Sequence, residues 1–413
     1  MPRPGVFSVN LGYRLLNGYV PACFPKTPRG NLLLVYCLLI SALTALTNWF
    51  LLPLPRVLAS SNWSSQRIGW IMGMFLGIWT ISQLLSGVLA RQYGNRTLAL
   101  AGSALGICSG CCYFLFPSFP YMILPARILH GAGSAFVYSG VLYLLLDGVL
   151  LADRAKTIGF YGLPGVAMSI VGPAIAETIE RYWGVVAILS LVAPVFCVLL
   201  VGIWKLRDST KHQDVSVASS VGQWQSTGTK IHIILMLMIS VGACSSVWQT
   251  FLAPLVTHLG PGALSNFAIG HGLGAIMSRL SLGARIDKGK ARLAAVLGLV
   301  LFGGGLTLLP KAHFGWQFAI IGLVSGITYG LAFIAVISLA FEKMLPQETT
   351  VGTALLLASI GLGGFLGPPI WGAVVDKFGY NVCFILAGCA LTVASLAFVV
   401  VEFAKRPTHN VAR

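Results

Sequence analysis

An arginine interrupts a long apolar stretch in the second half of the chain. In SRLSLGARIDKGKAR, residues 278–292, Arg279 precedes Asp287 by eight residues, about 12 Å along an α-helix. A charge inside a membrane helix is costly, and such residues usually serve a binding site or an ion path. A guanidinium is a planar fork of donors that matches a carboxylate. Arg279 is therefore a candidate anion ligand. The alternative is an arginine that extends toward the next loop or pairs with a neighbouring helix.

The other charged groups within apolar stretches are mainly positive. Arg127 accompanies Arg279, whereas Glu177 is the one clear acid. Exporters of cationic drugs usually need a buried carboxylate, so a positive interior favours an anionic substrate. Uncharged polar residues in the same stretches are candidates for the lining of a substrate cavity: Asn48, Tyr138, Gln249 and Tyr329.

Two histidines are candidates for moving a proton. His130 and His271 lie in apolar stretches, and imidazole is the side chain whose pKa in water is nearest neutrality. Arg127 and Glu177 are further candidates for proton coupling. The structural alternative is that Arg127 forms an ion pair with Glu177 across two helices, and that each histidine is a satisfied polar group in the core.

The composition predicts that lipid surrounds most of the chain. Of 413 residues, 56% are hydrophobic and only 9% are charged, whereas soluble domains carry about 25% charged residues. Apolar windows long enough to cross a bilayer recur twelve times. They span residues 31–55, 66–90, 96–116, 120–148, 155–178, 184–205, 230–256, 262–286, 292–310, 314–342, 349–374 and 379–403. The expected fold is an all-α membrane protein of twelve transmembrane helices.

The distribution of Lys and Arg predicts the topology. If both termini are cytoplasmic, the outer loops hold few basic residues: Arg56, Arg67, Arg181, Lys311 and Lys377. Apart from Arg127 and Arg279, all other Lys and Arg then lie inside, as expected for a multi-pass protein of the cell (inner) membrane. This accounts for the net charge of +16 without nucleic acid. The cytoplasmic segments are the tails 1–30 and 404–413 and the polar linker 207–229.

The two halves of the chain repeat each other. Gly131 and Gly326 are 195 residues apart, as are GPAIAETIERYWG (172–184) and GPPIWGAVVDKFG (367–379). A constant offset predicts two pseudo-symmetric six-helix bundles, residues 31–206 and 230–403. In such transporters the substrate binds near the midplane between the repeats.

Three motifs resemble the major facilitator superfamily. GVLARQYGNR (87–96) resembles the G-x-x-x-D-R-x-G-R-R loop of that family, with Arg91 in place of the acid, and residues 283–292 repeat the pattern. RILHGAG (127–133) resembles its R-x-x-x-G signature. The resemblance implies the major facilitator fold and transport by alternating access.

A finer resemblance is to the monocarboxylate transporter and oxalate–formate exchanger branch. It rests on Pro55-Arg56, on NWSSQRIGWIMG (62–73) and on SRLSLG (278–283). The resemblance implies that Arg279 holds the substrate carboxylate, with Arg56 as an outer gate or second cation, and that a monocarboxylate moves by proton symport. Ala275 stands where animal members carry a proton-transferring aspartate, which leaves a histidine as the candidate carrier.

Acids at the inner helix ends are candidates for a gate. Asp147 has Arg91 and Arg96 as possible partners, and Glu342 has Arg285 and Lys288. With Asp287 and the basic run after it, these residues would form an inner latch that breaks when the inner face opens.

Other classes of protein are less compatible with the sequence. We expect no enzyme and no cofactor, because no Gly-rich phosphate loop is present. We expect no metal, because the cluster Cys108, Cys111 and Cys112 lacks His or acidic partners. The expected partners are a small organic anion, protons and membrane lipid, and the chain is expected to be a monomer. The alternatives are a proton-driven exporter of drugs or metabolites and a ligand sensor with a transporter fold.

Overall fold

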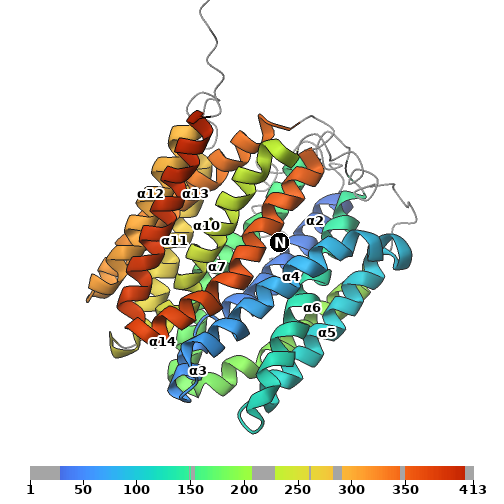
Figure 1. The fold of residues 1–413 in the computed structure, drawn as a ribbon. Helices are drawn as coiled ribbons and strands as arrows, with labels where there is room; N and C mark the ends of the chain where they lie inside the picture. The colour runs from blue at the N-terminus through green and yellow to red at the C-terminus, as the bar shows by residue number, and fades with distance from the viewer. Residues whose placement is uncertain are drawn as a thin grey trace, which may run out of the picture.

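The described part of the chain is helical. The computed structural model describes residues 28–147, 149, 154–206, 228–259, 262–281, 291–344 and 349–404, which form a bundle of roughly parallel and antiparallel helices (Figure 1). The first half contains α2 (Pro28–Trp49), α3 (Leu54–Ser60), α4 (Ser65–Tyr93), α5 (Asn95–Leu115), α6 (Ile123–Leu146), α7 (Arg154–Ser190) and α8 (Val192–Trp204). The second half contains α10 (Gly228–Leu255), α11 (Ala263–Ser281), α12 (Ala291–Leu308), α13 (Gly315–Phe341) and α14 (Thr349–Ala404). Short 3-10 helices are Pro120–Met122, Thr257–Leu259 and Leu309–Lys311.

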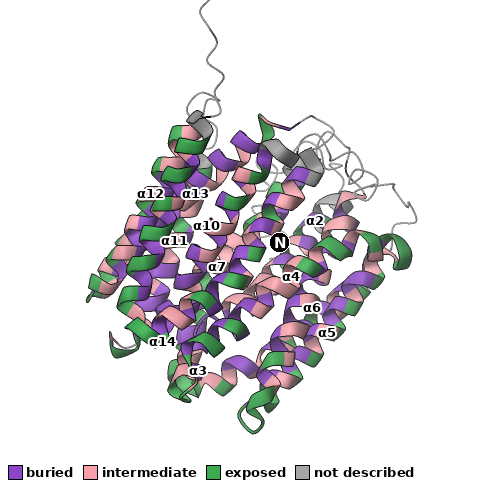
Figure 2. Cartoon of the chain, viewed as in Figure 1, coloured by how far each residue is buried: buried purple, intermediate pink, exposed green. Residues whose placement is uncertain are grey.

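The surface of the bundle is apolar, as lipid requires. Within the described residues, nine helices are long and apolar enough to cross a membrane, and Val192–Trp204 is a shorter apolar helix. On α12 the exposed residues Leu293, Leu297 and Leu301 recur every fourth position, so one face of the helix is an apolar stripe pointing outward. Figure 2 shows such exposed residues along the outer surface of the bundle. The protein is therefore a multi-pass integral membrane protein.

Two helices contain a sharp kink at a glycine. Gly184 in α7 has φ 76° and ψ 174°, and Gly379 in α14 has φ 81° and ψ 168°. Glycine adopts a positive φ without the steric cost that a Cβ would add. The two kinks are 195 residues apart and nearly identical, so the sequence repeat has a counterpart in the backbone.

Close glycine contacts follow the same repeat. A Cβ on Gly131 would lie 2.7 Å from the carbonyl oxygen of Phe75 on α4, and a Cβ on Gly326 would overlap the carbonyl of His271 on α11. Small residues let membrane helices approach closely, where van der Waals packing stabilises the pair. The buried apolar residues form one large cluster from positions 34–206 and another mainly from positions 231–398.

The two sets of helices meet at one end of the bundle. We call this the closed end; it carries α3, the first turn of α4 and the two kinks, and α3 lies at the bottom of Figure 1. There α4 packs against α14 and α7 against α11. A Cβ on Gly69 would overlap the carbonyl of Pro368, and one on Gly272 would overlap the side chain of Ile170.

At the opposite end the packing along α7 is open. A Cβ on Gly159, Gly162 or Gly165 would meet nothing within 4 Å. The same helix is tightly packed nearer the closed end, where a Cβ on Gly172 would lie 2.6 Å from Trp49. The packing around these three glycines of α7 is thus looser than the packing around Gly172.

Candidate functional site

A small cavity lies between the two sets of helices, next to the closed end. Its volume is about 40 Å³, enough for about three water molecules. Its lining combines polar and apolar residues from both halves of the chain, as ligand sites usually do. The lining residues are Asn48, Trp49, Leu51, Leu52, Met72, Phe75, Leu76, Arg127, Ser246, Gln249, Thr250 and Pro368.

Arg127 is the charged member of this lining. Its side chain is buried, 2% exposed. Nε donates to the carbonyl of Ile71 at 3.3 Å, and Nη2 donates to the carbonyl of Met72 at 3.2 Å. The guanidinium carbon lies 4.9 Å from the centre of the Phe75 ring. Among the described residues, Nη1 has no hydrogen-bond partner. The structural alternative of an ion pair between Arg127 and Glu177 is not formed, because carbonyls of α4 accept the hydrogen bonds of the guanidinium.

Two of the residues predicted to line a cavity do so. Asn48 of α2 and Gln249 of α10 face the cavity from opposite halves of the chain. Neither side-chain amide makes a hydrogen bond within the described residues. Both amides therefore have donors and acceptors free for a ligand.

Tyr329 lies elsewhere, in an aromatic cluster within the second half. Its ring centre is 5.3 Å from Phe302 and 5.7 Å from His271. His271 also packs on Trp248, with 5.0 Å between ring centres, and its Nδ1 has no partner among the described residues. Tyr329 and His271 are thus neighbours, but neither lines the cavity.

His130 is fully buried one helical turn from Arg127. Its Nε2 lies 3.0 Å from the hydroxyl of Thr47, and its Nδ1 lies 3.4 Å from the hydroxyl of Tyr113. The imidazole ring is 4.9 Å from Phe75, which also contacts Arg127. His130 therefore links α6 to α2 and α5, directly behind the wall of the cavity.

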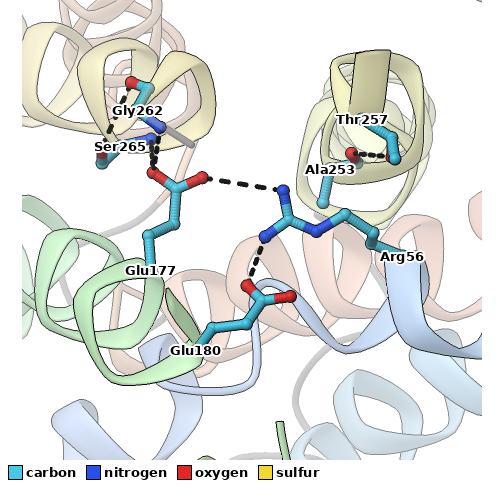
Figure 3. A network of polar contacts seen from close by, with 7 residues as sticks. All are labelled: Arg56, Glu177, Glu180, Ala253, Thr257, Gly262 and Ser265. Atoms are coloured by element: carbon cyan, nitrogen blue, oxygen red, sulfur yellow. Dashed lines mark hydrogen bonds and ion pairs between the residues drawn. The ribbon is translucent and has the colours of Figure 1, made fainter. Parts of the chain in front are cut away.

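A network of charges joins the halves at the closed end (Figure 3). Arg56 forms ion pairs with Glu180 and, at 3.8 Å, with Glu177. Oε2 of Glu177 accepts hydrogen bonds of 3.1 Å from the backbone N–H groups of Gly262 and Ser265, at the start of α11. The N-terminus of a helix carries a partial positive charge, so a carboxylate is stabilised there. Arg56 lies in this network and is not among the residues that line the cavity.

A second carboxylate caps a helix of the other half. Asp376 of α14 accepts hydrogen bonds from the backbone N–H of Ser65 at 2.7 Å and of Gln66 at 3.0 Å, at the start of α4. Asp376 is not among the site residues predicted from the sequence. Its neighbour Lys377 was assigned to an outer loop, and an acid in a polar loop gives no signal of such a contact.

Arg279 lies in the last described turn of α11. Its side chain is exposed, contrary to the expectation of a buried arginine. It is two turns from Gly272 on the same face of α11, and that face packs against Ile170 of α7 nearer the closed end. Arg279 is close enough to Tyr329 for an electrostatic interaction. Arg279 is thus exposed beside Tyr329 and is not among the residues that line the cavity.

Four residues of the predicted inner latch, Arg91, Arg96, Asp147 and Glu342, lie within the part of the chain that the structure describes. Nη2 of Arg96 donates to the carbonyl of Trp204 at 2.6 Å, so Arg96 contacts the end of α8. Asp147 accepts a 2.9 Å hydrogen bond from the Asn95 amide. Arg91 and Glu342 are exposed. Asp287, Lys288 and Arg285 lie outside the described residues, so a latch involving them stays a prediction.

Comparison with known proteins gives the class of this fold. The family model described as Major Facilitator Superfamily matches residues 34–355 and 236–413. The chain belongs to the Major Facilitator Superfamily, and it is a transporter.

Individual relatives are distant in sequence. Monocarboxylate transporter 11 of Homo sapiens is 24% identical, over 81% of this chain and 75% of that protein. Monocarboxylate transporter 11 of Mus musculus is 25% identical, over 82% of this chain and 80% of that protein. An uncharacterized MFS-type transporter of Escherichia coli, YcaD, is 22% identical over 84% of this chain and 87% of its own length. The chain is a Major Facilitator Superfamily transporter that resembles the monocarboxylate branch.

A solved structure has the same fold. The nucleoside transporter NupG matches with a TM-score of 0.69, covering 91% of this chain and 100% of that chain at 13% identity. A mutant of the same transporter gives a TM-score of 0.72. At this identity the likeness concerns the fold alone.

Proposed function

We propose that this chain is a secondary active transporter that moves a small organic anion, a monocarboxylate, by alternating access with proton symport. One observation carries the choice of an anion. The interior acid Glu177 is engaged by Arg56 and by the start of α11, so it does not neutralise Arg127. Arg127 is then the one charged side chain that lines the described cavity. A cavity with an unbalanced positive charge favours a negative ligand.

The proposed topology has twelve spans. The kink at Gly184 would end the fifth span, so that residues 185–190 and α8 form the sixth, and the kink at Gly379 would divide α14 into two spans. This gives six-helix bundles at residues 31–206 and 230–403 joined by the linker 207–229. The closed end would be extracellular and the termini cytoplasmic, in agreement with the few Lys and Arg in the loops of the closed end. The described conformation is then open to the cytoplasm.

In this proposal Arg279 meets the substrate on the open side. An exposed guanidinium is accessible to a carboxylate arriving from the cytoplasm, or leaving toward it. The similarity to monocarboxylate transporter 11 supports the substrate class, as does the resemblance of SRLSLG to that branch. Protons would be carried by His130 or His271, one in each half of the chain.

The test is uptake of labelled lactate, pyruvate and acetate into proteoliposomes containing the purified protein. We expect uptake that an inward proton gradient accelerates and that a protonophore abolishes. An uptake rate that does not change with the proton gradient would contradict proton symport. Absence of uptake and of counterflow for all three acids, in protein with an intact circular dichroism spectrum, would overturn the monocarboxylate assignment and favour an exporter of other metabolites.

A further inference from the structure

The guanidinium of Arg127 has donors that the protein does not use. A guanidinium carries five N–H groups, and the carbonyls of Ile71 and Met72 accept from Nε and Nη2. Nη1 is buried and makes no hydrogen bond of good geometry among the described residues, although the Tyr113 hydroxyl lies close to the guanidinium. Leaving a buried charged donor without an acceptor costs more than an ordinary hydrogen bond contributes. A group that accepts hydrogen bonds and carries negative charge would remove this cost.

The surroundings of Arg127 favour a carboxylate as that group. The amides of Asn48 and Gln249 line the same cavity and have no protein partner within the described residues. Each amide can donate to a carboxylate oxygen. The remaining walls include Trp49, Leu52 and Phe75, which suit a short apolar substituent. A volume of about 40 Å³ accommodates a carboxylate head and little more.

We propose that the guanidinium of Arg127, together with the amides of Asn48 and Gln249, forms a carboxylate-binding position deep in the bundle, separate from Arg279. This inference rests on the proposed function and assigns it a second site. The carboxylate binds as an anion, and no covalent bond is made or broken. Because Asn48 belongs to the first half and Gln249 to the second, one bound carboxylate contacts both halves. Occupancy of this position therefore stabilises the closed end.

The test uses equilibrium binding of labelled pyruvate to the full-length protein in detergent, where transport does not contribute. The main variant is Asn48→Asp. It keeps Arg127 and its two bonds to α4, and it places a carboxylate in the cavity that competes with the ligand for the guanidinium of Arg127. We expect the affinity for pyruvate to fall at least about tenfold, because the loss of one charge-assisted hydrogen bond weakens binding by about this factor. Asn62→Asp, the same chemical change at an exposed position of the closed end, is the matched control and keeps normal binding.

A second variant, Arg127→Lys, tests the guanidinium itself. A lysine ammonium lacks the fork that reaches two carbonyls and the cavity together, so we expect a similar weakening. Normal pyruvate binding in Asn48→Asp would overturn the inference while leaving the proposed function in place. Failure of the unaltered protein to bind pyruvate, lactate or acetate would overturn the proposed function, and the inference with it.

Discussion

The carboxylate of Glu177 accepts a hydrogen bond of 3.1 Å from the backbone N–H of Ser265, so a side chain of the first half caps a helix of the second. Asp376 makes the reciprocal contact, because it belongs to the second half and caps α4 of the first. Each half therefore places one carboxylate on a helix N-terminus of the other. These contacts are made only while the two halves touch at the closed end, which makes them the natural place to bias an alternating-access equilibrium.

Replacing Glu177 with Gln should favour opening of the closed end. The amide removes the ion pair with Arg56 and the charge at the start of α11, a loss of about 1–2 kcal/mol for largely buried groups. A cysteine at Thr250, in the cavity, should then react about tenfold faster with a membrane-impermeant thiol reagent applied from the closed end. Thr178→Ala, an exposed change on the same helix, is the control. An unchanged labelling rate in Glu177→Gln would show that this network does not hold the end closed.

Asp376→Asn should act in the same direction and independently. Asp376 and Glu177 join different helix pairs, α14 with α4 and α7 with α11, so their effects on the closed state should add to within about 0.5 kcal/mol. The measurement is the same cysteine labelling in both single variants and in the double variant. If the double variant is labelled no faster than the faster of the two single variants, the two carboxylates do not act through separate contacts.

Gly69→Ala should prevent the closed end from forming. The added Cβ would overlap the carbonyl of Pro368 on α14, a backbone atom that cannot move aside without shifting the helix. Gly162→Ala is the matched control, because a Cβ there meets nothing within 4 Å, and alanine favours a helix over glycine by about 1 kcal/mol. We expect uptake to fall at least about tenfold in the first variant and to persist in the second. Equal uptake by both would argue against close α4–α14 contact during transport.

Arg279→Gln should impair transport without affecting folding. The side chain is exposed, so its replacement leaves no buried group unpaired. Loss of a charge-assisted contact to a carboxylate costs about 1.5–3 kcal/mol, or roughly 10- to 100-fold in uptake at low substrate concentration. Arg67→Gln, also exposed and placed over the Trp63 ring, is the control for removing a surface charge. Wild-type uptake by Arg279→Gln would eliminate Arg279 as a substrate ligand.

The internal repeat shows where prediction from sequence works and where it stops. The 195-residue offset identified Gly131 with Gly326, and in the structure both pack against a backbone carbonyl of the adjacent helix. The offset does not identify the two capping acids. Glu177 corresponds to position 372, whereas Asp376 lies four residues further on, about one helical turn. Two acids with the same task thus occupy different positions in the repeat, and only the folded chain brings each to a helix N-terminus.

The sequence by itself determined the helical membrane fold, because apolar windows of bilayer length permit few other structures. It also indicated Asn48, Gln249 and Arg127 as polar groups in apolar helices. Tertiary structure decided their partners. Arg127 and Glu177 have opposite charges and lie on consecutive long helices, yet they do not pair with each other. Arg127 donates to backbone carbonyls of α4, and Glu177 pairs with Arg56 and with the start of α11. Periodicity tells which residues are inside, whereas the partner of a buried charge depends on how the helices are stacked.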